Sequence, residues 1–306
     1  MFVRARARKT VVALAGAAMV TSLVAASWPA EQAPGLSYTI RVSSRPRGGR
    51  QGGMLPAGPG NWNWTGNVVV TGGRGRVDIT EGGAEGLLGS GDYMLFDSQD
   101  FVIVRPGTKE YIGLPGGTIT GGLEMLRAMP NMQVDVSDLQ VKMEKVGPGE
   151  PIDGQPTQHY RLTSGYIVSI YAAFIQQAMA LESTTDYWVA NVDGLTSGPF
   201  QKLFSGVLSL GGIVKEIGPK MDAEIARMGN VSPLKAVTVT SISDGRGATS
   251  ESEATILVSS IKRREVDASL LVLPDDYEAS KARGLAQILG SASKVDLGAK
   301  WKAKRP

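Results

Sequence analysis

Short runs in which apolar and polar residues alternate dominate the chain from Tyr38 onward. Tyr38, Ile40 and Val42 alternate with polar neighbours, which is the period-2 pattern of a β-strand with one buried face. The pattern predicts a mainly β protein of the α+β class. Further one-sided strands are predicted at residues 67–71, 76–80, 133–146, 157–164, 185–191, 234–242, 253–261 and 268–273.

A three-stranded meander is predicted at residues 92–96, 101–105 and 109–114. Its first two strands are apolar on both faces, at residues 93–96 and 101–104, and strands of this kind are normally covered on both faces. We therefore expect helices, a second layer or a ligand to lie over this part of the sheet.

Helical spacing of apolar residues appears in two places, residues 121–129 and residues 199–228. Gly211, Gly212 and Pro219 are expected to break the second region into two or three pieces. Residues 166–182 combine strand-like alternation with good helix formers, and we favour an extended structure there. A segment rich in glycine and proline, residues 45–61, is predicted to be a mobile loop.

The first 26 residues have the three-part layout of a secretory signal, with four basic residues, an apolar stretch and a small-residue exit. A membrane anchor is the alternative, but the apolar run only reaches the lower limit of a span, about 17 residues. Removing residues 1–26 changes the balance from 32 basic and 29 acidic residues to 28 basic and 29 acidic. The exported protein is thus expected to be nearly neutral, which gives no reason to propose a nucleic-acid partner. Its location is predicted to be periplasmic or extracellular.

The chain contains no cysteine, which excludes thiolate metal sites, cysteine nucleophiles and a lipid-modified cysteine. No metal-binding or phosphate-binding motif is present, so neither a metal nor another cofactor is predicted. His159 is the only histidine. A hydrolase would have to use it, yet no Gly-x-Ser-x-Gly motif accompanies it. We interpret His159 as a strand residue on a polar face, and expect pairing with residues 185–191 to bring Asp186 and Trp188 close to His159 and Arg161.

Three groups of residues resemble exported bacterial proteins of the lipoprotein-carrier (LolA-like) fold. They are the meander from Gly91 to Tyr111, the strand around His159 with the strand around Asp186, and the closing segment from Leu270 to Tyr277. The resemblance implies an incomplete, curved antiparallel barrel, with helices over a concave apolar face that holds acyl chains. This sequence departs from the carriers in its greater length, its glycine-rich loop and its basic tail.

The resemblance implies a non-enzymatic protein that binds a lipid or another apolar molecule on the concave face. The alternative is a cell-envelope module that binds a protein partner and no small molecule. Residues 27–36 would form a linker, residues 37–279 the half-barrel, and residues 280–306 a basic, solvated tail that, with the signal, provides any membrane contact. The predicted ligand-binding residues are Tyr93, Leu95, Phe101, Ile103, Tyr160, Leu162, Tyr187, Phe200 and Phe204.

Overall fold

Strands make up most of the chain in the computed structural model, which describes residues 32–48, 62–84, 88–97, 100–115, 131–172, 175–195, 217–244, 248–280 and 301–302. All of these residues belong to one unit, residues 31–306. The predicted signal (1–26), most of the predicted loop (49–61), the predicted helix at 121–129 and residues 199–216 lie outside the described residues. No helix among the described residues has the length and apolar character needed to cross a membrane.

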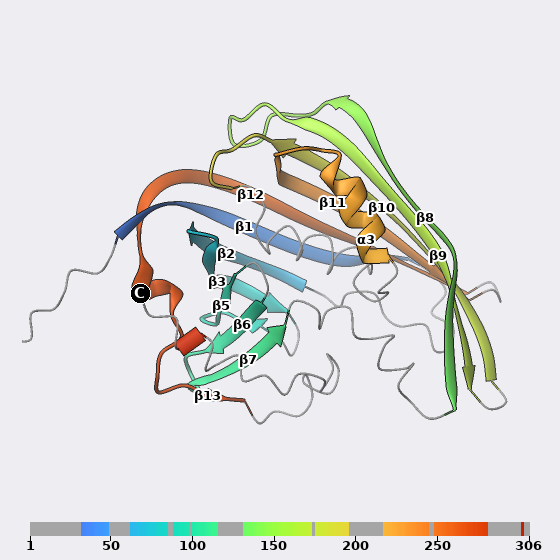
Figure 1. The fold of residues 1–306 in the computed structure, drawn as a ribbon, viewed down its shortest axis with the longest axis horizontal. Coiled ribbons are helices and arrows are strands. Elements are labelled where there is room, and N and C mark those ends of the chain that lie inside the picture. The colour runs from blue at the N-terminus through green and yellow to red at the C-terminus, as the bar shows by residue number, and fades with distance from the viewer. Residues whose placement is uncertain are drawn as a thin grey trace, which may run out of the picture. The chain divides into compact units, whose positions relative to one another are not determined.

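The strands form one sheet in the order β13-β7-β6-β5-β3-β2-β1-β12-β11-β10-β9-β8, with β4 paired to β3 (Figure 1). All neighbours in this order are antiparallel except β13 and β7. The pairing of β1 with β12 joins the early strands to the late ones in the middle of the sheet. The elements in chain order are β1 (Gln32–Gly48), β2 (Trp62–Thr71), β3 (Arg74–Ala84), β4 (Leu88–Gly89), β5 (Tyr93–Phe96), β6 (Asp100–Arg105), β7 (Glu110–Pro115), β8 (Met132–Pro148), β9 (Gln158–Ala172), β10 (Ile175–Ala190), α3 (Ile217–Ala226), β11 (Ser232–Ser243), β12 (Thr249–Asp267), the 3-10 helix η3 (Ala268–Leu271) and β13 (Glu278–Ala279).

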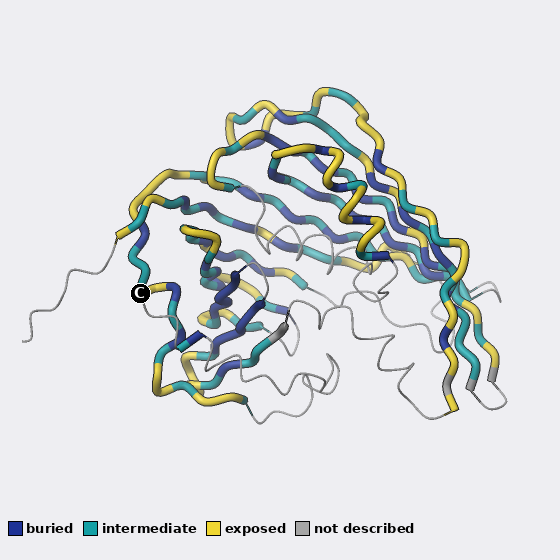
Figure 2. Tube along the Cα trace, viewed as in Figure 1, coloured by how far each residue is buried: buried dark blue, intermediate teal, exposed yellow. Residues whose placement is uncertain are grey.

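The alternation read from the sequence is present in the long strands, where buried and more exposed residues follow one another (Figure 2). In β11 every second residue from Ser232 to Ile242 is buried. We call the face that carries these residues and contacts α3 the inner face, and the opposite one the outer face. The sheet is curved, and its terminal strands β8 and β13 do not pair with each other in the described part of the chain (Figure 1).

The described part of region 199–228 contains one helix, α3, which packs beside β8. Ile217, Met221 and Ile225 are its buried residues, at the four-residue spacing that places side chains on one helix face. Pro219, which was predicted to break the region 199–228, lies in the first turn of α3, where a helix needs no backbone N–H from it. The number of helical pieces before Ile217 stays a prediction, because residues 199–216 lie outside the described residues. The structure therefore shows a mainly β protein with one described helix on the sheet, and not the several helices expected over the concave face.

Three expectations on extended segments have different outcomes. The described residues of this segment, 166–172 and 175–182, are extended, as favoured, within β9 and β10. Residues 268–273 do not form the predicted strand, because Ala268–Leu271 is a 3-10 helix whose N-cap, Asp267, accepts a hydrogen bond from the Ser269 backbone. The predicted linker 27–36 is in part strand, since β1 begins at Gln32.

The meander β5–β7 is covered on both faces, as predicted. Met94 and Phe96 belong to the inner-face core, whereas Tyr93 and Leu95 belong to a second cluster on the other side. Trp301, from the predicted solvated tail, is fully buried in that second cluster together with Leu273. The predicted tail is therefore packed against the sheet at Trp301. Burial removes the large apolar surface of the indole ring from water, which stabilises this position.

Candidate functional site: the inner face of the sheet

The inner face carries one continuous apolar cluster that extends across the sheet from β8 to β6. Leu162, Leu234 and Ile256 represent its part on the long strands, and each is almost completely buried. The cluster exists because period-2 alternation in neighbouring strands, kept in register by the hydrogen-bond ladder, places every apolar set on the same side.

Four of the predicted ligand-binding residues lie in this inner cluster: Phe101, Ile103, Leu162 and Tyr187. Tyr160 is partly buried and packs against the same cluster. Phe200 and Phe204 lie outside the described residues.

Tyr93 and Leu95 were assigned to the same face, and this placement is wrong. The register pairs Tyr93 with Val104 and Leu95 with Val102, so these four residues form the second cluster, on the side opposite to Phe101 and Ile103. Odd positions of β5 share a face with even positions of β6. Because residues 93–96 and 101–104 are all apolar, only the length of the turn between the two strands fixes which residues share a face.

Three buried tyrosines of the inner face have a shifted pKa. Burial raises the pKa of Tyr38, Tyr166 and Tyr187 above the usual value of a tyrosine. A raised phenol pKa keeps the group protonated at neutral pH. These three residues therefore contribute hydroxyl groups, and no charge, to the inner face.

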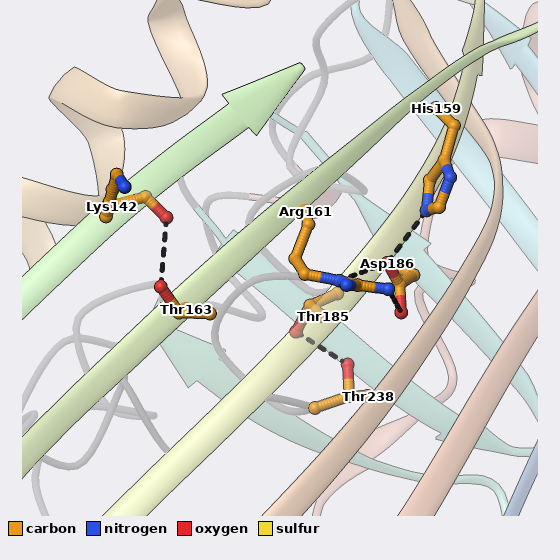
Figure 3. A network of polar contacts seen from close by, with 7 residues as sticks. All are labelled: Lys142, His159, Arg161, Thr163, Thr185, Asp186 and Thr238. Carbon is orange, nitrogen blue, oxygen red and sulfur yellow. Dashed lines mark hydrogen bonds and ion pairs between the residues drawn. The ribbon is translucent and has the colours of Figure 1, made fainter. Parts of the chain in front are cut away.

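Six serine and threonine residues are buried at inner positions of three adjacent strands, and sequence reasoning missed them. Thr185 of β10 and Thr238 of β11 are paired in register, and their hydroxyls are 2.9 Å apart (Figure 3). The signal was present as serine and threonine at alternate positions, where a one-sided strand normally carries apolar residues. The six residues are Ser164, Ser183, Thr185, Ser232, Thr238 and Thr240.

A polar cluster lies on the outer face of β9 and β10, in the register that the sequence predicted. Arg161 pairs with Asp186, and His159 with Trp188. The His159 Nε2 atom is 2.7 Å from Asp186 Oδ1, and Arg161 Nε donates to the same oxygen at 2.9 Å (Figure 3).

Two contacts of the Trp188 ring extend this outer cluster from β9 and β10 to β11. The rings of His159 and Trp188 are parallel, with centroids 4.7 Å apart, and Lys235 Nζ lies 4.5 Å from the centre of the Trp188 ring. In the described part of the chain no serine or threonine hydroxyl contacts the His159 ring. Among the described residues the arrangement orients a histidine without placing a hydroxyl nucleophile beside it.

Carboxylates and the histidine do not gather elsewhere in a way that suits a metal ion. Among the described residues no group of three or more histidine, aspartate or glutamate side chains could hold one.

Comparisons with known proteins do not assign this chain to a family. No family model matches the sequence, and no curated protein matches it. A solved structure of an uncharacterised conserved protein from Thermus thermophilus aligns with 80% of this chain and 89% of its own, at 11% identity and a TM-score of 0.28. A similarity at that level carries no argument about fold or function.

Proposed function

We propose that this chain is an exported, non-enzymatic protein that binds a lipid or another apolar molecule on the inner face of its curved sheet. The observation that carries the proposal is the continuous apolar cluster of that face in a sheet whose end strands are unpaired with each other. The proposed architecture is an incomplete barrel of the LolA-like type, with further helical cover over the concave face besides α3.

A face of this kind needs a cover or a guest for a physical reason. Leaving one large apolar side chain in water instead of burying it costs about 1.5–3 kcal/mol. Residues of the α3 region already provide part of the cover, because Met221 and Met228 pack into the inner cluster. Methionine side chains are flexible and polarisable, so they adapt to guests of different shape.

The test uses two neighbouring residues on opposite faces of β10. Met179 is partly buried against the inner cluster, and Ala178 is exposed. A carboxylate on the inner face would be costly beside an apolar guest. We expect Met179→Glu to weaken binding of the fluorescent probe N-phenyl-1-naphthylamine by about tenfold or more, equivalent to about 1.4 kcal/mol, and Ala178→Glu to leave it unchanged.

Organic extraction of the purified protein, followed by mass spectrometry, tests the natural guest. We expect a bound apolar compound in preparations of the wild-type protein and less of it in Met179→Glu. A protein that yields no such compound and binds no probe would contradict the proposal.

Export is the second part of the proposal, and it rests on the basic, apolar and small-residue segments of residues 1–26. Expression in a bacterium with fractionation of the periplasm, and mass measurement of the recovered chain, tests it. We expect a chain that begins near residue 27. A full-length chain retained in the membrane fraction would support the anchor instead.

A protein-binding role is the second candidate, and the outer polar cluster favours it. Trp188 and Arg161 are residue types enriched at the energetic centres of protein interfaces. The stack with His159 and the cation–π contact with Lys235 hold the indole in place. Cross-linking in envelope preparations would test it. A cross-linked complex lost in Trp188→Ala but kept in Met179→Glu would favour this role over ligand binding.

A further inference from the structure

A row of buried hydroxyl groups crosses the inner face. Ser164 of β9 is paired with Ser183 of β10, and Ser183 with Thr240 of β11. Side chains directly opposite each other in antiparallel strands have their Cβ atoms about 4.5–5.5 Å apart. We call these three residues the hydroxyl row. Their exposed fractions are 9%, 8% and 4% in this order.

Ser183, the middle residue of the row, differs from the adjacent threonine pair in how its hydroxyl is satisfied. In the adjacent row the hydroxyls of Thr185 and Thr238 bond to each other (Figure 3). The Oγ atom of Ser183 is buried and has no hydrogen-bond partner among the described residues. A buried hydroxyl without a partner is costly, and a ligand atom that completes its hydrogen bond removes that cost.

Buried residues lie on both sides of the row along the strands. In one direction Leu181 and Ile242 are paired two positions away. In the other direction the bonded pair of Thr185 and Thr238 comes first, and Tyr187 and Ala236 are paired two positions beyond it. The hydroxyl row and this threonine pair therefore form a narrow polar band within the inner cluster, a pattern that suits a molecule with one polar group on a long apolar body.

The three strands that carry the row place no charged side chain on the described part of their inner face. The described inner-face positions of β9, β10 and β11 hold no aspartate, glutamate, lysine or arginine. An anionic head group placed at Ser183 would lose its hydration, and no positively charged side chain on these inner positions would offset the cost of that desolvation. A neutral hydroxyl, ester or amide group needs only the hydrogen bond.

We propose that the ligand of the inner face is a long-chain amphiphile whose uncharged hydrogen-bonding group binds at the hydroxyl row, with Ser183 as its main partner. This inference rests on the proposed function and specifies the class of ligand.

Three sixteen-carbon probes test it: hexadecane, 1-hexadecanol and palmitate at pH 8, each competing with N-phenyl-1-naphthylamine. We expect the wild-type protein to bind the alcohol about fivefold or more tightly than the alkane or the carboxylate, which is the size of effect that one buried hydrogen bond produces. Ser183→Ala is expected to reduce the affinity for the alcohol to that for the alkane. Thr240→Val, which removes the neighbouring hydroxyl, is expected to have a smaller effect in the same direction.

Thr184→Val is the matched control, because Thr184 is adjacent to Ser183 and points to the outer face. It should leave all three affinities unchanged. Equal binding of alcohol and alkane by the wild-type protein, or tightest binding of palmitate, would overturn this inference and leave the apolar site intact. Absence of binding of every probe would contradict the proposed function itself.

Discussion

Glu224 of α3 accepts a hydrogen bond from the backbone N–H of Met143 in β8 at 2.8 Å. One turn earlier, Lys220 Nζ lies 3.5 Å from the carbonyl oxygen of Leu139. β8 is the end strand of the sheet, and its unpaired backbone groups would otherwise face water or another chain. Helix α3 thus covers the inner face with its apolar residues and satisfies the free edge of β8 with its polar ones.

We predict that Glu224→Ala exposes this edge. The Met143 amide would lose its partner, so its hydrogen exchange should become faster and the urea midpoint of unfolding lower. Asp222→Ala is the control on the same helix, because Asp222 is exposed, and it should change neither. Unchanged exchange at Met143 in Glu224→Ala would show that the contact does not protect the edge.

The same contact predicts a pH dependence. The hydrogen bond from Met143, with a smaller contribution from Arg227, lowers the pKa of Glu224 below its usual value of 4.5. A carboxyl group whose pKa is lower in the folded state stabilises the fold fully above the unfolded pKa, and this stabilisation is lost as the pH falls through the folded pKa. Stability measured from pH 6 down to pH 3 should therefore fall less in Glu224→Gln than in the wild-type protein. Parallel curves would exclude the contribution.

The sequence predicted contacts that depend on a local period and missed those that depend on distant segments. The register of β9 and β10 followed from alternation together with one opposite-charge pair, Arg161 and Asp186. Alternation cannot assign a face in β5 and in residues 101–104 of β6, where every residue is apolar, and the assignment of Tyr93 and Leu95 failed there. The burial of Trp301 and the contact of Glu224 with Met143 join segments far apart in the chain, and no periodic pattern encodes them.

The buried pair of Thr185 and Thr238 predicts a non-additive double mutant. Thr185→Val should destabilise the protein by about 1–3 kcal/mol, because it leaves the Thr238 hydroxyl buried without this partner. The double variant Thr185→Val/Thr238→Val removes both hydroxyls at nearly constant volume and should recover part of the loss. Urea unfolding of the four proteins measures this coupling. Additive losses would mean that the two hydroxyls do not depend on each other.

The outer pair of Arg161 and Asp186 predicts a small effect on stability. The Arg161 side chain is 45% exposed, and solvent screens the pair. A double-mutant cycle with Arg161→Ala and Asp186→Ala should give a coupling free energy below about 1 kcal/mol. A much larger coupling would indicate that the cluster has a structural role beyond register. The same variants should bind N-phenyl-1-naphthylamine like the wild-type protein, because their side chains lie on the outer face.

From the burial of Trp301 we predict that residues 301–302 stabilise the meander. Its ring is fully buried against residues such as Leu95 and Leu273, and Arg74 lies over it at 5.8 Å. Lys302 fixes the segment further by donating hydrogen bonds to the carbonyl oxygens of Asp275 and Tyr277. Trp301→Ala should lower the free energy of unfolding by about 3–5 kcal/mol, as large truncations in cores do.

The matched control for Trp301→Ala is Leu270→Ala, since Leu270 is 38% exposed. It should change the free energy of unfolding by no more than about 0.5 kcal/mol. Hydrogen exchange then locates the effect: in Trp301→Ala the amides of β5 and β6 should lose more protection than those of β9 and β10, because the second cluster contacts only the meander side of the sheet. An equal loss of protection in all four strands would show that the tail stabilises the sheet as a whole. No loss of protection would contradict the packing of Trp301 and support the solvated tail predicted from the sequence.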